Sequence, residues 1–152
     1  MDSKKLVIGA FAYAVIAQVV HALGSIASMQ YYTDPALFSM WSKLMMPGNA
    51  PPGAEFYIAS IAAALIAGAI YTYLYEITRV VFLAKAKKNF KGGNPYMPGL
   101  KFGALMFLAV SLTGFMTFVL LFAFPLGLQV EWLIEGFAIF MLWGASLGAI
   151  YR

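Results

Sequence analysis

The sequence predicts an all-α membrane protein, a bundle of four transmembrane helices. Hydrophobic residues make up 62% of the chain and charged residues 11%, and the mean hydropathy is +0.82. Soluble domains are only roughly 45–50% apolar, so this composition excludes a soluble globular domain. The charges are also segregated, which leaves four apolar stretches of the ~20 residues needed to cross a hydrocarbon core. They lack the alternation of barrel strands, which favours helices with internally satisfied backbone hydrogen bonds.

The predicted spans divide one membrane domain, residues 1–152, into short segments. The spans are residues 6–28, 54–82, 100–124 and 130–151. A connection over residues 29–53 joins the first two spans, and a basic linker over residues 83–99 joins the second to the third. We do not expect the linker to be a continuous helix, because Gly92, Gly93, Pro95 and Pro98 interrupt it.

Basic residues fix the predicted orientation. With a cytoplasmic N-terminus, nine of the ten lysines and arginines lie inside and only Lys43 lies outside. Both termini should therefore be cytoplasmic, and the basic linker should rest against anionic headgroups. This linker offers no aromatic-interleaved basic surface, so we expect no nucleic-acid partner.

The first external connection predicts a short interfacial helix. Asp34 provides a cap and Pro35 a first helical position, while Pro47 and Gly48 end the pattern. The apolar face of this helix would consist of Leu37, Phe38, Trp41, Leu44 and Met45. Such a helix would lie at headgroup depth and cover the outer end of the bundle, or serve only as a surface spacer.

An internal similarity suggests a duplicated two-helix hairpin. Residues 68–71 and 148–151 share the sequence Gly-Ala-Ile-Tyr, and Glu55 and Glu135 precede them at the same distance. Each unit holds two crossings, so the copies would be parallel repeats. Chance similarity among small apolar residues is the alternative.

Polar residues in the outer half of the bundle form the main candidate site. Gln18, His21, Ser25 and Ser28 recur at helical spacing along the first span. The first and fourth spans run in opposite directions, so His21 and Glu135 should meet in the outer leaflet. The candidate intramembrane polar cluster is therefore Gln18, His21, Ser25, Glu55, Glu131 and Glu135.

This cluster admits three interpretations. Ser, Gln and His side chains often only join membrane helices, for about 1 kcal/mol each. A proton or ion pathway is the second interpretation, because histidine titrates near neutral pH and intramembrane ionisable residues point to function. A metal site is the third, although the spacings of zinc and di-iron sites are absent from the sequence. We expect no cofactor and no metal.

At the cytoplasmic end, Glu76 and Arg79 form a second candidate pair, three residues apart on the second span. Tyr71, Tyr75 and Tyr151 lie at the same level and suit an aromatic belt, with a quinone headgroup as an alternative use. Ser60, Ala64 and Gly68, and likewise Gly144 and Gly148, form strips of small residues suited to close helix packing within one chain or in a homodimer.

Several segments together resemble small prokaryotic four-span membrane proteins. They are Tyr31-Tyr32, the aromatic loop around Trp41, Ile70-Tyr71, residues 132–136 and residues 144–151. The resemblance implies a four-helix architecture in a bacterial or archaeal cell membrane, and no activity or site residues.

The sequence therefore favours a non-catalytic membrane module that self-associates or serves as an accessory subunit of a larger complex. With no cysteine and one histidine, the chain offers no enzyme signature. A small transporter or channel that uses His21 and Glu135 is the first alternative. A quinone- or metal-binding membrane subunit is the second.

Overall fold

Four helices in the structure are long and apolar enough to cross a membrane. The computed structural model describes residues 2–89, 94 and 96–151, and within the second long helix it describes side chains as far as Arg79. The long helices are α1 (Ser3–Ala27), α3 (Ala54–Asn89), a third made of α4 (Met97–Met106), η3 (Phe107–Leu112) and α5 (Thr113–Leu121), and α6 (Leu126–Ile150). The prediction of an all-helical chain with four apolar spans is confirmed for the described residues.

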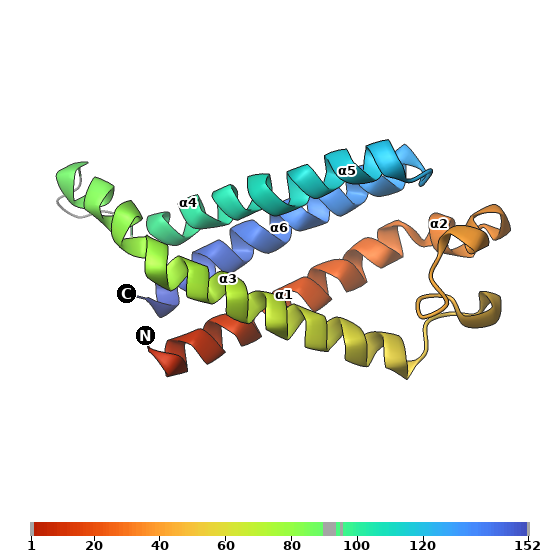
Figure 1. Cartoon of the computed structure of the whole chain (residues 1–152), viewed down its shortest axis with the longest axis horizontal. Helices are drawn as coiled ribbons and strands as arrows, with labels where there is room; N and C mark the ends of the chain where they lie inside the picture. Colours follow the sequence, from red (N-terminus) through yellow and green to blue (C-terminus); the bar gives the residue numbers. More distant parts are fainter. Residues whose placement is uncertain (1, 90–93, 95, 152) are drawn as a thin grey trace.

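The long helices form two hairpins, α1 with α3 and α4–α5 with α6, and α1 also packs on α6. Figure 1 shows both chain ends on one side of the molecule, which we name the terminal end, and the α1–α3 connection on the opposite side, the loop end. Near the terminal end α3 lies next to α4, whereas toward the loop end α3 diverges from α5 (Figure 1). The hairpins are therefore joined along α1 and α6, and near the chain termini also through α3 and α4.

The connection between α1 and α3 differs from its prediction. It holds α2 (Met29–Thr33), the 3₁₀ helix η1 (Pro35–Met40) and the 3₁₀ turn η2 (Pro47–Asn49). Asp34 caps η1 through a 2.9 Å bond from the Ala36 N–H, as expected. The predicted continuous helix through Met45 is wrong, because the backbone of Trp41 is extended. A 3₁₀ helix rarely runs beyond a few residues, and the extended backbone lets the Trp41 ring turn onto other aromatic rings.

The segment between α3 and α4 is shorter than the linker predicted over residues 83–99. Helix α3 continues to Asn89, and Pro98 occupies the first turn of α4, where its missing N–H needs no partner. Gly92, Gly93 and Pro95, the other predicted breaks, lie outside the described residues. The third span also contains a π-helical segment, η3, which the sequence analysis did not predict.

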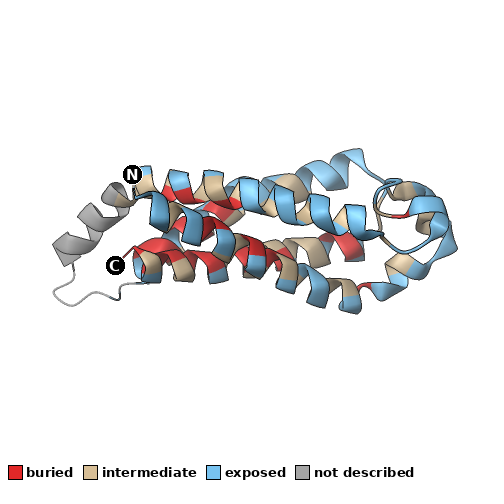
Figure 2. Cartoon of the chain, turned by 90° about the horizontal axis from the view of Figure 1, so that it is seen from below, coloured by how far each residue is buried: buried red, intermediate tan, exposed pale blue. Residues whose placement is uncertain are grey.

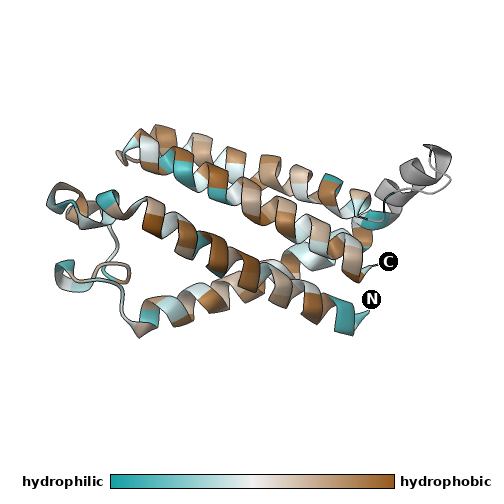
Figure 3. Cartoon of the chain, turned by 180° about the vertical axis from the view of Figure 1, so that it is seen from behind, coloured by the Kyte–Doolittle hydropathy of each residue, from teal (hydrophilic) through white to brown (hydrophobic). Residues whose placement is uncertain are grey.

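The hydrophobic core lies in the half of the bundle next to the termini. Its members are Tyr75, Phe102, Met106, Phe140, Trp143, Leu147 and Tyr151. Trp143 is fully buried at its centre, and its indole N–H donates to the Gly9 carbonyl across 3.1 Å. Figure 2 shows the buried segments gathered toward the chain termini, and Figure 3 shows hydrophobic residues along all four helices with more hydrophilic ones near the two ends.

Small residues bring the helices of each hairpin close together. A Cβ on Gly68 would strike the Ala10 carbonyl of α1. On α6, Gly144 faces Gly99 and Gly103 of α4, where added Cβ atoms would strike opposing backbone. The two strips predicted from the sequence are thus both used inside one chain, each within its own hairpin. The matching strip on α4, Gly99 and Gly103, was missed although its spacing of four was visible in the sequence.

Candidate functional site

Three side-chain contacts join α1 to α3 and α6 in the half of the bundle next to the loop end. We name the six residues that make them the polar cluster: Gln18 and His21 of α1, Ser28 at the C-cap of α1, Ser60 of α3, and Glu131 and Glu135 of α6. The spacing of the α1 members places them along one side of that helix. The cluster therefore holds together three helices at the level where the hairpins diverge.

His21 and Glu135 form the central contact of the polar cluster. His21 Nδ1 lies 2.6 Å from Glu135 Oε2, a short hydrogen-bond distance. The Glu135 side chain is 10% exposed and that of His21 is 55% exposed. The carboxylate is thus enclosed by protein while one side of the imidazole stays open.

Gly24 makes room for the Glu135 carboxylate. It lies three residues after His21 and hence on the same side of α1. A Cβ on Gly24 would overlap Oε1 of Glu135, whose other oxygen meets His21. The position of the pair therefore depends on the absence of a side chain at Gly24 as well as on His21 and Glu135 themselves. The sequence analysis did not identify this glycine.

The two flanking contacts extend the cluster along α1. Toward the loop end, the fully buried Ser28 hydroxyl donates to Glu131 Oε2. Toward the terminal end, Gln18 Nε2 donates to Ser60 Oγ across 2.9 Å. Polar groups therefore follow α1 from Ser28 to Gln18, with the His21–Glu135 pair between them.

Two predicted members of the cluster lie elsewhere or make other contacts. The Ser25 hydroxyl donates to the Ala22 carbonyl of its own helix across 2.9 Å. Glu55 lies in the first turn of α3, where it lines a surface hollow with Lys43 and Phe56. The repeat would place Glu55 and Glu135 in equivalent positions, but the structure gives only Glu135 a place in the polar cluster.

Aromatic rings cover the loop end of the polar cluster. Tyr32 stacks on Trp41 with ring centroids 4.8 Å apart, and Trp41 also meets Phe124 and Trp132 of the other hairpin at 5.6 and 6.3 Å. Burial raises the pKa of Tyr32, and the negative charges of Glu135 and Glu131 add to this rise. The first connection is therefore packed over the carboxylates rather than held away from them.

At the terminal end, Glu76 and Arg79 converge on Tyr151. The Tyr151 hydroxyl donates to Glu76 Oε2 at 3.4 Å, while Arg79 Nη1 donates to the Tyr151 carbonyl at 3.4 Å and its guanidinium lies over the ring. Glu76 Oε1 also accepts from the Asp2 backbone N–H at 2.8 Å. Glu76 and Arg79, which the sequence predicts as a pair, thus bind both described ends of the chain to α3. Helix spacing did not reveal their contacts with Tyr151.

Among the described residues, no three His, Cys, Asp or Glu side chains lie together in a way that could hold a metal ion. No protein-family model, curated protein or solved structure matches this sequence. The inference about function therefore has to come from the polar cluster itself. Its central chemistry is the partly exposed imidazole of His21 in contact with the enclosed carboxylate of Glu135.

Proposed function

We propose that this chain is a small multi-pass transporter or channel that moves protons, or a cation exchanged for them, through the His21–Glu135 pair. The observation that carries this proposal is the 2.6 Å contact between the histidine and a carboxylate that is enclosed between apolar helices. An acidic residue at the centre of a membrane helix costs about 2.5–3.5 kcal/mol. A purely structural contact does not need an ionisable pair, since neutral polar side chains join helices equally well.

The two partners suit a proton relay. An imidazole ring carries two nitrogens, so it can accept a proton at one and release a proton from the other. A proton can pass from Nδ1 of His21 to Oε2 of Glu135 along the hydrogen bond between them. We place its entry at the exposed part of the imidazole ring, since the His21 side chain is 55% exposed. Gln18 and Ser60 are the next polar groups toward the terminal end. Glu135 then acts as the enclosed proton acceptor and His21 as its donor.

Charge distribution supports the direction of this pathway. The nine-to-one division of basic residues favours a cytoplasmic terminal end and a loop end outside the cell membrane. In that orientation His21 and Glu135 take protons from the outer side. The surrounding partner is the lipid bilayer, which the hydrophobic residues along all four helices would contact (Figure 3).

The structure gives less support to the module that self-associates or assists a larger complex. That interpretation rested on the small size of the chain, its lack of a soluble domain and the small-residue strips, and both strips face helices of the same chain. Gly68 meets α1, and Gly144 meets α4. A homodimer would need another surface, so the proton-handling function takes first place.

Proton flux through proteoliposomes tests the proposal. With a pH-sensitive dye inside the vesicles, we expect the parent protein to carry protons and Glu135→Gln to lower the flux at least tenfold. Glu55→Gln is the matched control, because it makes the same change on α3 outside the polar cluster, and it should keep the parent flux. No flux in the parent, or equal flux in both variants, would refute the proposal.

A second variant tests the geometry rather than the charge. In Gly24→Ala, the new methyl group overlaps Glu135 Oε1, which is the flexible end of a side chain and can swing aside. We expect a folded protein with reduced proton flux, because the carboxylate leaves its position beside His21. Gly53→Ala, where an added Cβ meets nothing within 4 Å, is the control and should match the parent.

A further inference from the structure

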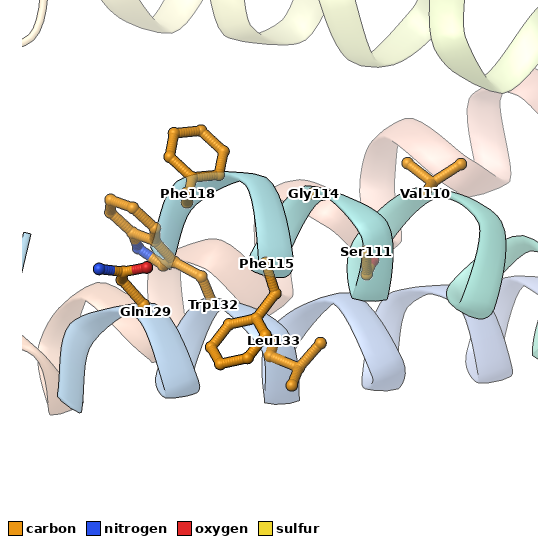
Figure 4. Close-up of a pocket in the computed structure, with 8 residues that line it drawn as sticks. All are labelled: Val110, Ser111, Gly114, Phe115, Phe118, Gln129, Trp132 and Leu133. Carbon is orange, nitrogen blue, oxygen red and sulfur yellow. The ribbon is translucent and has the colours of Figure 1, made fainter. Parts of the chain in front are cut away.

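On the side of α6 away from the polar cluster, a cavity of about 180 Å³ lies between α6 and the third span, and a buried glutamine lines it. Figure 4 shows its lining side chains, which come from η3, α5 and α6. They are Val110, Ser111, Phe115, Phe118, Gln129 and Trp132, with Gly114 and Leu133 completing the wall. Val110 and Phe118 are more than one third exposed at its rim, so a molecule dissolved in the bilayer can reach the cavity from the side.

Gln129 gives this cavity an unused hydrogen-bond acceptor. The residue is 4% exposed, and its Nε2 donates to the Phe124 carbonyl across 2.8 Å. Its Oε1 has no partner among the described residues. Burying an amide oxygen without a donor costs about 1–3 kcal/mol, and Figure 4 shows this oxygen on the side of Trp132, at one end of the cavity.

The opposite end of the cavity is shaped by the π-helical segment and a glycine. Ser111 lies within η3 (Phe107–Leu112), and π-helical turns inside longer helices are frequently found at functional sites. Gly114 follows one turn later, and a Cβ there would meet nothing within 4 Å. The open space therefore continues from the Ser111 hydroxyl past Gly114 to the aromatic rings of Phe118 and Trp132.

We propose that this cavity binds the hydroxylated ring of a small aromatic molecule that enters from the bilayer. An apolar cavity of about 150 Å³ holds one benzene ring, so the size is right for a single ring. The walls of Phe115, Phe118 and Trp132 suit edge or offset ring contacts. The buried Gln129 oxygen can only accept, so it selects a ring that carries a hydroxyl donor over one that does not.

Two fluorinated probes of equal shape test this selection. 4-Fluorophenol carries a hydroxyl where 4-fluorotoluene carries a methyl group, and fluorine NMR reports binding of each to the protein in lipid nanodiscs. We expect the parent protein to bind 4-fluorophenol about five- to tenfold more tightly, the effect of one hydrogen bond to a buried acceptor. Equal binding of the two probes in the parent, the result for a groove that takes only lipid chains, would overturn the proposal.

Two variants locate the binding. Gln129→Met keeps a side chain of similar length without the acceptor, so the preference for 4-fluorophenol should disappear while 4-fluorotoluene still binds. Gly114→Leu fills the cavity from a position with free space, so binding of both probes should fall at least tenfold. A Gly114→Leu protein that binds both probes like the parent would refute the location. Neither residue belongs to the polar cluster, so proton flux should stay unchanged in both variants.

Discussion

The half of the bundle next to the chain termini and the half next to the loops are built differently. The terminal half is held by the aromatic and aliphatic core around Trp143 and by glycine contacts in which backbone meets backbone. The loop half is held by the polar cluster, and there α3 diverges from α5 (Figure 1). Lipid gives helices no hydrophobic reason to associate, so close packing must join them at one end. The other end is then free to carry an ionisable pair.

The largest expected change in stability is in the terminal half, where the Trp143 indole is removed from the core. Trp143→Ala should lower the free energy of unfolding by about 3–5 kcal/mol, because it leaves a cavity at a fully buried position and removes the bond to Gly9. Unfolding in mixed micelles with increasing SDS measures this change. Leu142→Ala, next in sequence but 55% exposed, should change the free energy by less than about 0.5 kcal/mol. Equal losses in both variants would contradict a core centred on Trp143.

A smaller effect is expected in the loop half, where the pair is proposed to serve function more than stability. His21→Leu alone leaves the enclosed Glu135 carboxylate without its partner and should cost about 1–3 kcal/mol. The double variant His21→Leu with Glu135→Leu should regain the parent free energy of unfolding or exceed it, because no buried charge remains. A double variant as unstable as the sum of the single changes would show that the polar pair holds this half together.

The smallest effect concerns Tyr151 at the terminal end. Burial, followed by the negative charge of Glu76, raises the pKa of Tyr151 to about 12. A phenol whose pKa is raised on folding keeps its full stabilising contribution below its ordinary pKa of about 10 and loses it as the pH passes 12. Tyr151→Phe should therefore cost about 0.5–1 kcal/mol at pH 7. The difference between parent and variant should shrink between pH 10 and pH 12, as measured by unfolding in mixed micelles; a constant difference would contradict a buried phenol.

Parts of both halves could be predicted from the sequence. Apolar runs between charged segments located the four spans, because their length must match a bilayer. The contact between His21 and Glu135 followed from opposite helix directions and similar depth, and the structure places these residues 2.6 Å apart. The end of η1 at Met40 could not be predicted, since Trp41, the residue that follows it, packs on rings of the other hairpin that are distant in the sequence.

By itself the sequence determined four stretches long and apolar enough to cross a membrane, because composition and hydropathy act locally along the chain. It also determined which residues are too polar to face lipid. Only the tertiary structure decided that Ser28 meets Glu131 and Gln18 meets Ser60. It also decided that Glu55 lies apart from the polar cluster, and that each small-residue strip faces its own hairpin. The reason is that the rotation and crossing angle of packed helices depend on how their whole surfaces fit together. The spacing of residues along one helix does not show which residues of the neighbouring helix they contact.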